Sequence, residues 1–93
     1  MSRSYVWDLE KARINLAKHG VSFDEAATVD LDPNRRRWPD AAHDRDDDRF
    51  ITIGHSRGGF LLFVITSERG PQPRMVSARR ATKRERREYE TRP

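Results

Sequence analysis

The feature that most constrains the fold is one uninterrupted apolar run, from Phe60 to Ile65. A run of this length fits a strand and is far too short for a helix that spans a membrane. A strand that is apolar throughout is expected in the centre of a sheet, where both of its faces are covered. The chain is therefore expected to fold around a sheet with this segment at its centre.

Weaker strand signals lie on both sides of the central run. Residues 50–53 and 74–78 are each separated from it by a glycine-containing turn, which predicts antiparallel hairpins. Residues 35–39 predict an edge strand, because Pro39 cannot donate a ladder hydrogen bond. Residues 5–7 form a further short strand candidate near the N-terminus.

The first helix is predicted over residues 9–19, with Asp8 as its N-cap. Leu9, Ala12 and Leu16 follow the spacing i, i+3, i+7 and predict an apolar stripe along it. Two cationic residues followed by glycine are typical of the end of a helix.

Two capping boxes predict the remaining helices. Ser22 and Glu25 open a short helix that ends by residues 30–33. Thr82 and Glu85 open a final helix that extends to about residue 91. Together the elements predict one α+β domain over residues 1–93: an N-terminal strand, two helices, an antiparallel sheet of three or four further strands, and a C-terminal helix.

The final helix has almost no apolar face, since Tyr89 is its only large hydrophobic residue. It must be held by arginine stems, by ion pairs such as Arg84–Glu88, or by a partner. The segment 79–92 carries seven cations and three anions, whereas the rest of the chain is balanced. The whole net charge of +4 therefore lies there, which favours a polyanion or an acidic partner. A solvated helix face is the alternative.

Composition excludes several classes of protein. Only 34% of the residues are hydrophobic and 37% are charged, so a deep-pocket enzyme is not expected and stability is marginal without a partner. Cysteine is absent, which excludes disulfides and thiolate metal sites. The sequence begins without the apolar segment of a signal peptide, and we expect a cytoplasmic protein with no membrane partner.

Several motifs follow one another in a specific order. They are Val6-Trp7-Asp8, Asn15-Leu16, the segment Lys18 to Ala26, Arg49-Phe50-Ile51 with Ile53-Gly54, Phe63 to Arg69, and Ser77 to Thr82 with Glu85-Arg86 and Tyr89-Glu90. With these motifs the chain resembles, over nearly its whole length, the BrnT toxins of bacterial type II toxin–antitoxin modules. Residues 33–39, with three arginines, and the proline-rich turn at 70–73 depart from the family pattern.

The resemblance implies a RelE-like ribonuclease fold, RNA cleavage and growth arrest. It also implies neutralisation by a cognate BrnA-type antitoxin with a ribbon-helix-helix DNA-binding part. Operator DNA would then be bound only through the complex. Two alternatives stay open: a non-catalytic nucleic-acid-binding regulator, and a decayed toxin that serves as a corepressor.

Metal-free RNA cleavage needs a base for the 2′-hydroxyl, a cation for the phosphorane and an acid for the leaving 5′-oxygen. Arginine suits the second role, because it is permanently charged and bidentate toward phosphate, so Arg69, Arg79 and Arg80 are candidate clamps. Arginine cannot carry the proton. If the central strand and residues 74–78 pair as a simple antiparallel hairpin, Arg69 and Arg79 lie at opposite ends of the sheet. Either the loop after the central strand curls, or one of the two arginines has another role.

For proton transfer the candidates are His43, His19 and Glu68. Capping of the first helix is the alternative for His19, and an ion pair with Arg69 is the alternative for Glu68. His55, near a turn, is interpreted as a surface residue.

Five further side chains are candidates for binding RNA: Lys18, Lys83, Arg84, Trp38 and Tyr89. The two aromatic rings could stack on bases, although Tyr89 could instead pin the final helix to the sheet. Trp7 and Phe63 are interpreted as core residues. No nucleotide-binding loop is present, and the acidic loop with Asp44 and Asp46 to Asp48 lacks the spacing of a calcium site, so no cofactor or metal is expected.

Overall fold

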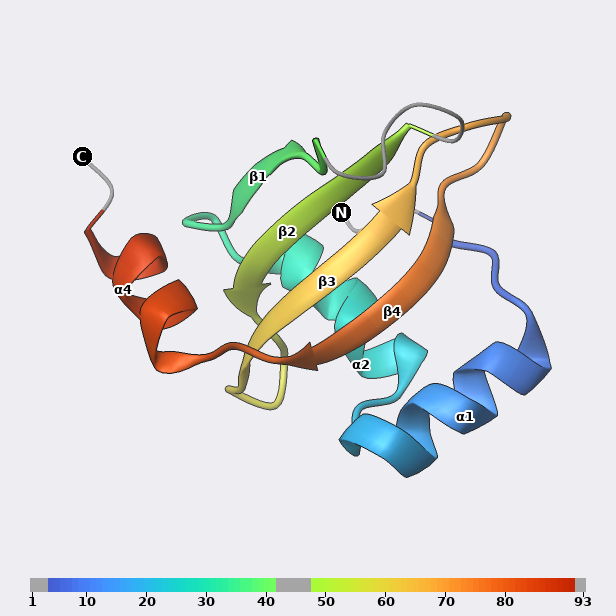
Figure 1. The fold of residues 1–93 in the computed structure, drawn as a ribbon, viewed down its shortest axis with the longest axis horizontal. Helices are drawn as coiled ribbons and strands as arrows, with labels where there is room; N and C mark the ends of the chain where they lie inside the picture. Colours follow the sequence, from blue (N-terminus) through green and yellow to red (C-terminus); the bar gives the residue numbers. More distant parts are fainter. Residues whose placement is uncertain (1–3, 42–47, 92–93) are drawn as a thin grey trace.

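The computed structural model describes residues 4–41 and 48–91 of the chain. Four antiparallel strands form one sheet in sequence order (Figure 1): β1 (Arg36–Pro39), β2 (Arg49–His55), β3 (Leu61–Ser67) and β4 (Arg74–Arg80). The apolar run forms β3, which has a neighbouring strand on each side, and β1 lies at the edge as expected from its proline. The predicted α+β fold with an antiparallel sheet is confirmed. Phe60 precedes β3 and its side chain is exposed.

Side-chain caps set the starts of the three α-helices, α1 (Leu9–His19), α2 (Phe23–Ala27) and α4 (Lys83–Glu90), and the 3-10 helix η1 (Thr28–Leu31) follows α2 directly. Asp8 accepts from the third amide of α1, and Thr82 and Glu85 form the predicted capping box of α4. The box at Ser22 is only half formed, because the Glu25 carboxylate accepts the N–H of Gly58 instead. Within the described ranges no helix is long and apolar enough to cross a membrane.

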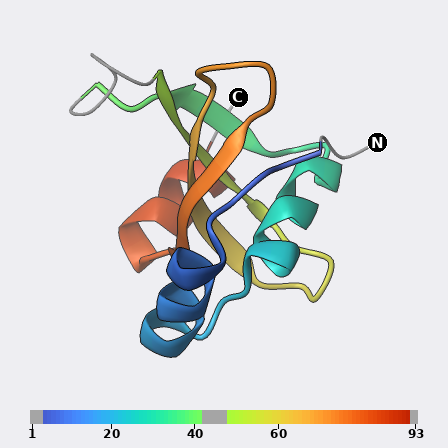
Figure 2. The same ribbon diagram turned by 90° about the vertical axis from the view of Figure 1, so that its right-hand side faces the viewer.

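The sheet is covered by different elements on its two faces (Figure 2). α2 and η1 lie on one face, α4 lies across the other, and α1 lies beside the β4 edge. Between the sheet and α2 lies the core cluster of Val21, Phe23, Ala26, Val29, Leu62, Val64, Met75 and Ala78. Trp7 packs edge-on against Phe23 with 5.8 Å between ring centroids, which agrees with its interpretation as a core residue.

α1 is held by a buried amide rather than by an apolar stripe. Leu9 and Leu16 are 81% and 50% exposed, so the predicted stripe is wrong, and only Ala12 of the three packs against the core. The buried side chain of Asn15 donates to the carbonyl oxygens of Val21 and Ala78 and accepts the N–H of Ala78. Hydrogen bonding therefore replaces much of the apolar contact that a helix normally makes with its sheet.

The predicted N-terminal strand is reduced to a single parallel bridge between Val6 and Arg74. The N–H of Val6 donates to Pro73, and the N–H of Met75 donates to Val6. Residues 5–7 thus extend the sheet beyond β4 for one residue and direct the chain into α1.

Candidate functional site

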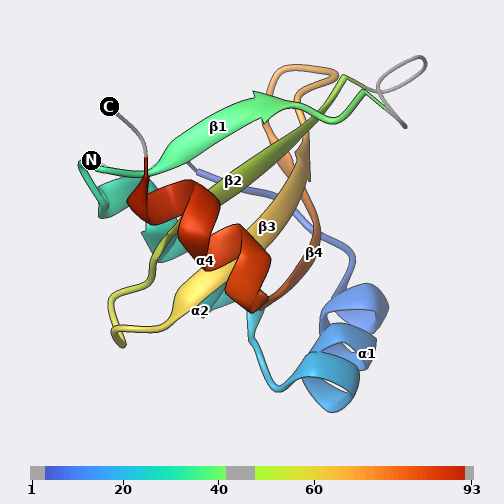
Figure 3. The same ribbon diagram turned by 60° about the vertical axis from the view of Figure 1, so that its left-hand side comes forward.

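Arg79 and Arg80 lie on opposite faces of the sheet. Arg79 is paired with Phe63 of β3, and Arg80 is paired with Leu62. Because successive side chains of a strand alternate, Arg80 shares the face of the core residue Leu62, whereas Arg79 lies on the face that α4 crosses (Figure 3). Two of the three candidate clamps, Arg79 and Arg80, therefore lie on different surfaces.

The guanidinium of Arg79 is fixed on three sides. It lies over the half-buried ring of Phe63, 4.1 Å from the centroid, so Phe63 is not a fully buried core residue. Nη1 and Nη2 donate to the two carboxylate oxygens of Glu85 at 2.9 Å, and Nη1 also donates to the carbonyl of Arg80. These bonds use three of the five N–H groups of an arginine. The side chain remains 35% exposed, so a ligand can reach the other donors.

Both members of this pair stay charged. The hydrogen bond to Glu85 raises the pKa of Arg79 above its ordinary value, against an opposing effect of burial. The hydrogen bonds from the Arg79 guanidinium lower the pKa of Glu85. Burial opposes this shift, and the hydrogen bond from the N–H of Thr82 lowers the pKa further. The site thus presents an oriented guanidinium rather than a mobile one.

Tyr89 fastens the other end of α4 to the sheet. It lies four residues after Glu85, so both side chains project from the same side of the helix. Its hydroxyl donates to Oδ2 of Asp32 at 2.6 Å. Burial and the Asp32 carboxylate raise the pKa of Tyr89 to about 12. The structure gives Tyr89 the pinning role that was the alternative to base stacking.

Other contacts of α4 differ from those predicted. Arg84 and Glu88, both within the described ranges, do not form the expected ion pair. Arg86 and Glu90 lie 3.9 Å apart instead, and the guanidinium of Arg36 donates to the carbonyl of Glu88. The helix has no buried residue, so polar contacts are its main attachment.

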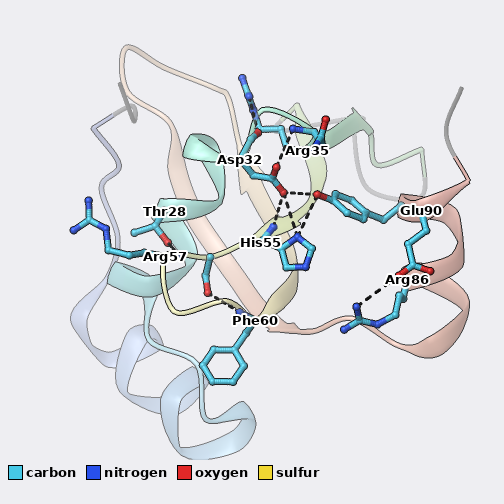
Figure 4. A network of polar contacts seen from close by, with 11 residues as sticks. Thr28, Asp32, Arg35, His55, Arg57, Phe60, Arg86 and Glu90 are labelled. Carbon is cyan, nitrogen blue, oxygen red and sulfur yellow. Dashed lines mark hydrogen bonds and ion pairs between the residues drawn. The ribbon is translucent and has the colours of Figure 1, made fainter.

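His55 lies beside Asp32 (Figure 4), and hydrogen bonds of the Tyr89 hydroxyl join Tyr89 to both in one polar cluster. Its Nδ1 lies 3.2 Å from the Tyr89 hydroxyl and 3.6 Å from Oδ2 of Asp32, and its ring meets the Tyr89 ring edge-on. The imidazole is 42% exposed, and Nε2 has no hydrogen-bond partner among the described residues. The interpretation of His55 as a surface residue missed this cluster, because the members of the cluster are far apart in the sequence.

Asp32 is the buried centre of the cluster. Burial acts to raise its pKa, but hydrogen bonds from the His55 amide, the Tyr89 hydroxyl and the Asn34 amide outweigh burial and lower it. The carboxylate is thus ionised and holds His55 and Tyr89 together. A histidine oriented through one ring nitrogen, with the other nitrogen open, suits proton transfer.

His55 and Arg79 lie on the same face of the sheet. His55 is paired with Leu61, and Arg79 is paired with Phe63, which places both on the α4 face with β3 between them. Strand spacings place their Cα atoms about 12 Å apart. One turn of α4 lies across this gap. Glu85 at the start of the turn contacts Arg79, and Tyr89 at its end contacts His55.

The candidate proton carriers predicted from the sequence are not next to Arg79. Glu68 follows β3 at the opposite end of the sheet, where it pairs with Arg37 at 2.9 Å. His19 is exposed in the last turn of α1. His43 lies outside the described residues.

The other predicted cations are spread over the surface. Arg80 stacks over Phe60 at 4.1 Å on the far face, and Arg69 follows β3 at the hairpin end. Lys18 is exposed near the end of α1, and Lys83 and Arg84 are exposed in the first turn of α4. Trp38 is half-buried on β1, opposite Ile51 and on the same face as Arg79. No three His, Cys, Asp or Glu side chains gather as a metal site in the described part of the chain.

Comparisons with known proteins point to one family. A family model described as "Ribonuclease toxin, BrnT, of type II toxin-antitoxin system" matches residues 7–85. The crystal structure of the Brucella abortus ribonuclease toxin BrnT is similar, with 26% sequence identity and a TM-score of 0.66. The match covers 85% of this chain and 96% of that chain. No curated protein matches the sequence.

Proposed function

The chain belongs to the BrnT family of ribonuclease toxins of type II toxin–antitoxin systems, and from this premise we propose that it cleaves cytoplasmic RNA on the α4 face of its sheet. The observation that carries the proposal is the placement of a fixed guanidinium, Arg79, and an oriented imidazole, His55, on that one face. They supply the two kinds of group that phosphodiester cleavage most needs.

In the proposed reaction, Nε2 of His55 takes the proton of the 2′-hydroxyl. The 2′-oxygen attacks phosphorus, and Arg79 donates through its open N–H groups to a non-bridging oxygen as charge develops there. The P–O5′ bond breaks, and the 5′-oxygen takes its proton from solvent. Asp32 and Tyr89 orient His55, and Glu85 orients Arg79.

We propose that this reaction needs no metal ion. The two groups assigned to the chemistry are a guanidinium and an imidazole, a set that suits electrostatic and acid–base catalysis rather than the binding of a divalent ion. In solution, cleavage of RNA by the purified chain is therefore expected to persist in excess EDTA. Loss of cleavage in EDTA, restored by a divalent ion, would contradict this part of the proposal.

The proposed partner is a BrnA-type antitoxin whose ribbon-helix-helix part binds the operator, so that the toxin reaches DNA only through the complex. The basic segment 79–92 suits an acidic partner segment, and α4, with no buried residue, offers an accessible surface. Binding by the antitoxin is expected to stop cleavage and growth arrest.

The test is to induce the chain in a host without its antitoxin and to examine cellular RNA. Fragmented RNA with growth arrest, reversed when the antitoxin is co-expressed, is the expected result. Intact RNA and normal growth in the presence of folded protein would instead favour the nucleic-acid-binding regulator or the decayed toxin.

A further inference from the structure

A second cationic site lies at the opposite end of the sheet from α4. A cavity of about 330 Å³ opens between the β3–β4 hairpin end and the N-terminus of α1. Its polar lining consists of Asp8, Lys11, Arg49, Ser67, Arg69 and Arg74. Four of these six residues are cations: Lys11, Arg49, Arg69 and Arg74.

Among the described residues that line the cavity, Asp8 is the one carboxylate, and it is already hydrogen-bonded. Oδ1 of Asp8 accepts the N–H of Lys11 and caps α1, so its position is set by the helix. The N-terminus of α1 adds the positive end of a helix dipole to the four cationic side chains. Lys11 and Arg74, two exposed cations of the lining, together with this helix end favour an anion with several oxygen atoms.

Strand register connects this cavity with the α4 face. Arg49 and Arg74 are the strand partners of Ser67, one on each side of it. Ser67 lies four residues after Phe63 on the same strand and so on the same face, about 13 Å away. At roughly 3.4 Å per stacked nucleotide, this separation corresponds to about four nucleotides of one strand.

We propose that this cavity is a phosphate-binding subsite for the RNA strand, a few nucleotides from the bond that is cleaved beside Arg79. The inference rests on the proposed function. Contacts to phosphate oxygens carry no sequence information, so the subsite gives affinity without sequence preference. It makes efficient cleavage dependent on the length of the RNA.

The test compares a variant with Lys11→Ala and Arg74→Ala with a matched variant, Arg57→Ala. Lys11 and Arg74 are exposed residues of the cavity lining, Lys11 on α1 and Arg74 at the start of β4. Arg57 is exposed in the turn between β2 and β3, near the α4 end of the sheet. The first measurement is binding of a non-cleavable 2′-O-methyl RNA of about 12 nucleotides at several salt concentrations, which does not depend on cleavage.

The double variant is expected to bind this RNA about tenfold more weakly, and its log–log salt slope is expected to fall by about 1.4, or 0.7 for each lost phosphate contact. A dinucleotide and inorganic phosphate are expected to bind the double variant and the wild type alike. Arg57→Ala is expected to change the slope by less than half as much.

Unchanged affinity and slope in the double variant would overturn the inference, whether or not the wild type cleaves RNA. An equal loss of inorganic phosphate binding would also overturn it, because the cavity would then be a site for free phosphate. Absence of cleavage by the wild type would contradict the proposed function alone. The two failures are therefore distinguishable.

Discussion

Arg79 and Arg80 are neighbours in the sequence, and their side chains project from opposite faces of β4. Arg79 lies over Phe63 and is bound by Glu85, whereas Arg80 lies over Phe60 on the other side of the sheet. The first two residues of the basic segment 79–92 thus lie on two different surfaces of the sheet. Of these two surfaces, the Arg79 surface is the one on which the described part of the chain places an oriented histidine, His55.

His55→Ala is expected to slow RNA cleavage strongly and to leave RNA binding nearly unchanged. The substitution removes Nε2, the proposed proton acceptor, but leaves the cations in place. General-base catalysis typically contributes 10²–10⁴-fold, so a loss of about this size in kcat is expected. Cleavage assays and RNA binding by the same preparation check this. His19→Ala, at an exposed position on α1, is the control; cleavage lost in His19→Ala but not in His55→Ala would reject the assignment.

Tyr89→Phe is expected to lower the free energy of unfolding by about 1–3 kcal/mol. The variant keeps the ring but loses the hydrogen bond to the ionised Asp32 carboxylate. Chemical denaturation measures the change, and amide exchange of residues 83–90 shows whether α4 detaches. Glu90→Ala, which changes only an exposed residue of the same helix, should have little effect. Equal stability of Tyr89→Phe and wild type would show that Tyr89 does not anchor α4.

Asn15→Ala is expected to destabilise the fold by about 2–4 kcal/mol, because backbone groups of Val21 and Ala78 lose their partner in a buried place. The loss should appear in the denaturation midpoint without a change in the m-value. Ile14→Ala, at a neighbouring residue that is 49% exposed, is the matched control and is expected to cost much less. If both variants lose the same stability, the role assigned to Asn15 is wrong.

Acid should weaken the attachment of α4. The pKa values of Glu85 and Asp32 lie below their ordinary values of 4.5 and 3.8, so the folded state favours the ionised carboxylates. Their contribution to stability is therefore complete above about pH 5 and is lost as the pH falls through the lowered folded-state values. Unfolding measured from pH 7 to pH 3 is expected to show this decline. Glu85→Gln should be less stable at pH 7 and should decline less; an unaltered pH dependence would contradict the account.

The local features of the sequence predicted most of the fold. Asp8 and Thr82 fixed two helix starts because a cap acts on amides only two or three residues away. The apolar run predicted the position of β3 because few other structures bury both faces of so short a segment. The error at α1 arose because an apolar spacing does not show whether a surface is available to cover the stripe.

The candidate site was harder to predict from the sequence than the fold, because its contacts join residues that are distant in the sequence. Asp32 is 23 residues from His55 and 57 from Tyr89, and no local pattern pairs them. The opposite orientation of Arg79 and Arg80 does follow from the alternation of side chains along a strand. A strand that includes both arginines is therefore sufficient to place them on different faces of the sheet.

The most direct test of the central claim is RNA cleavage by purified Arg79→Ala and Arg80→Ala in excess EDTA. The two variants remove the same charge from adjacent positions, so they differ mainly in the face that each changes. Circular dichroism first establishes that both are folded, since Arg79 also binds Glu85. Arg79→Ala is expected to lose kcat by about 10²–10³-fold, the size typical for a lost donor to a developing oxyanion, and Arg80→Ala is expected to cleave within a few-fold of wild type. Full cleavage by a folded Arg79→Ala, or its loss only in Arg80→Ala, would contradict the assignment of the α4 face as the catalytic surface.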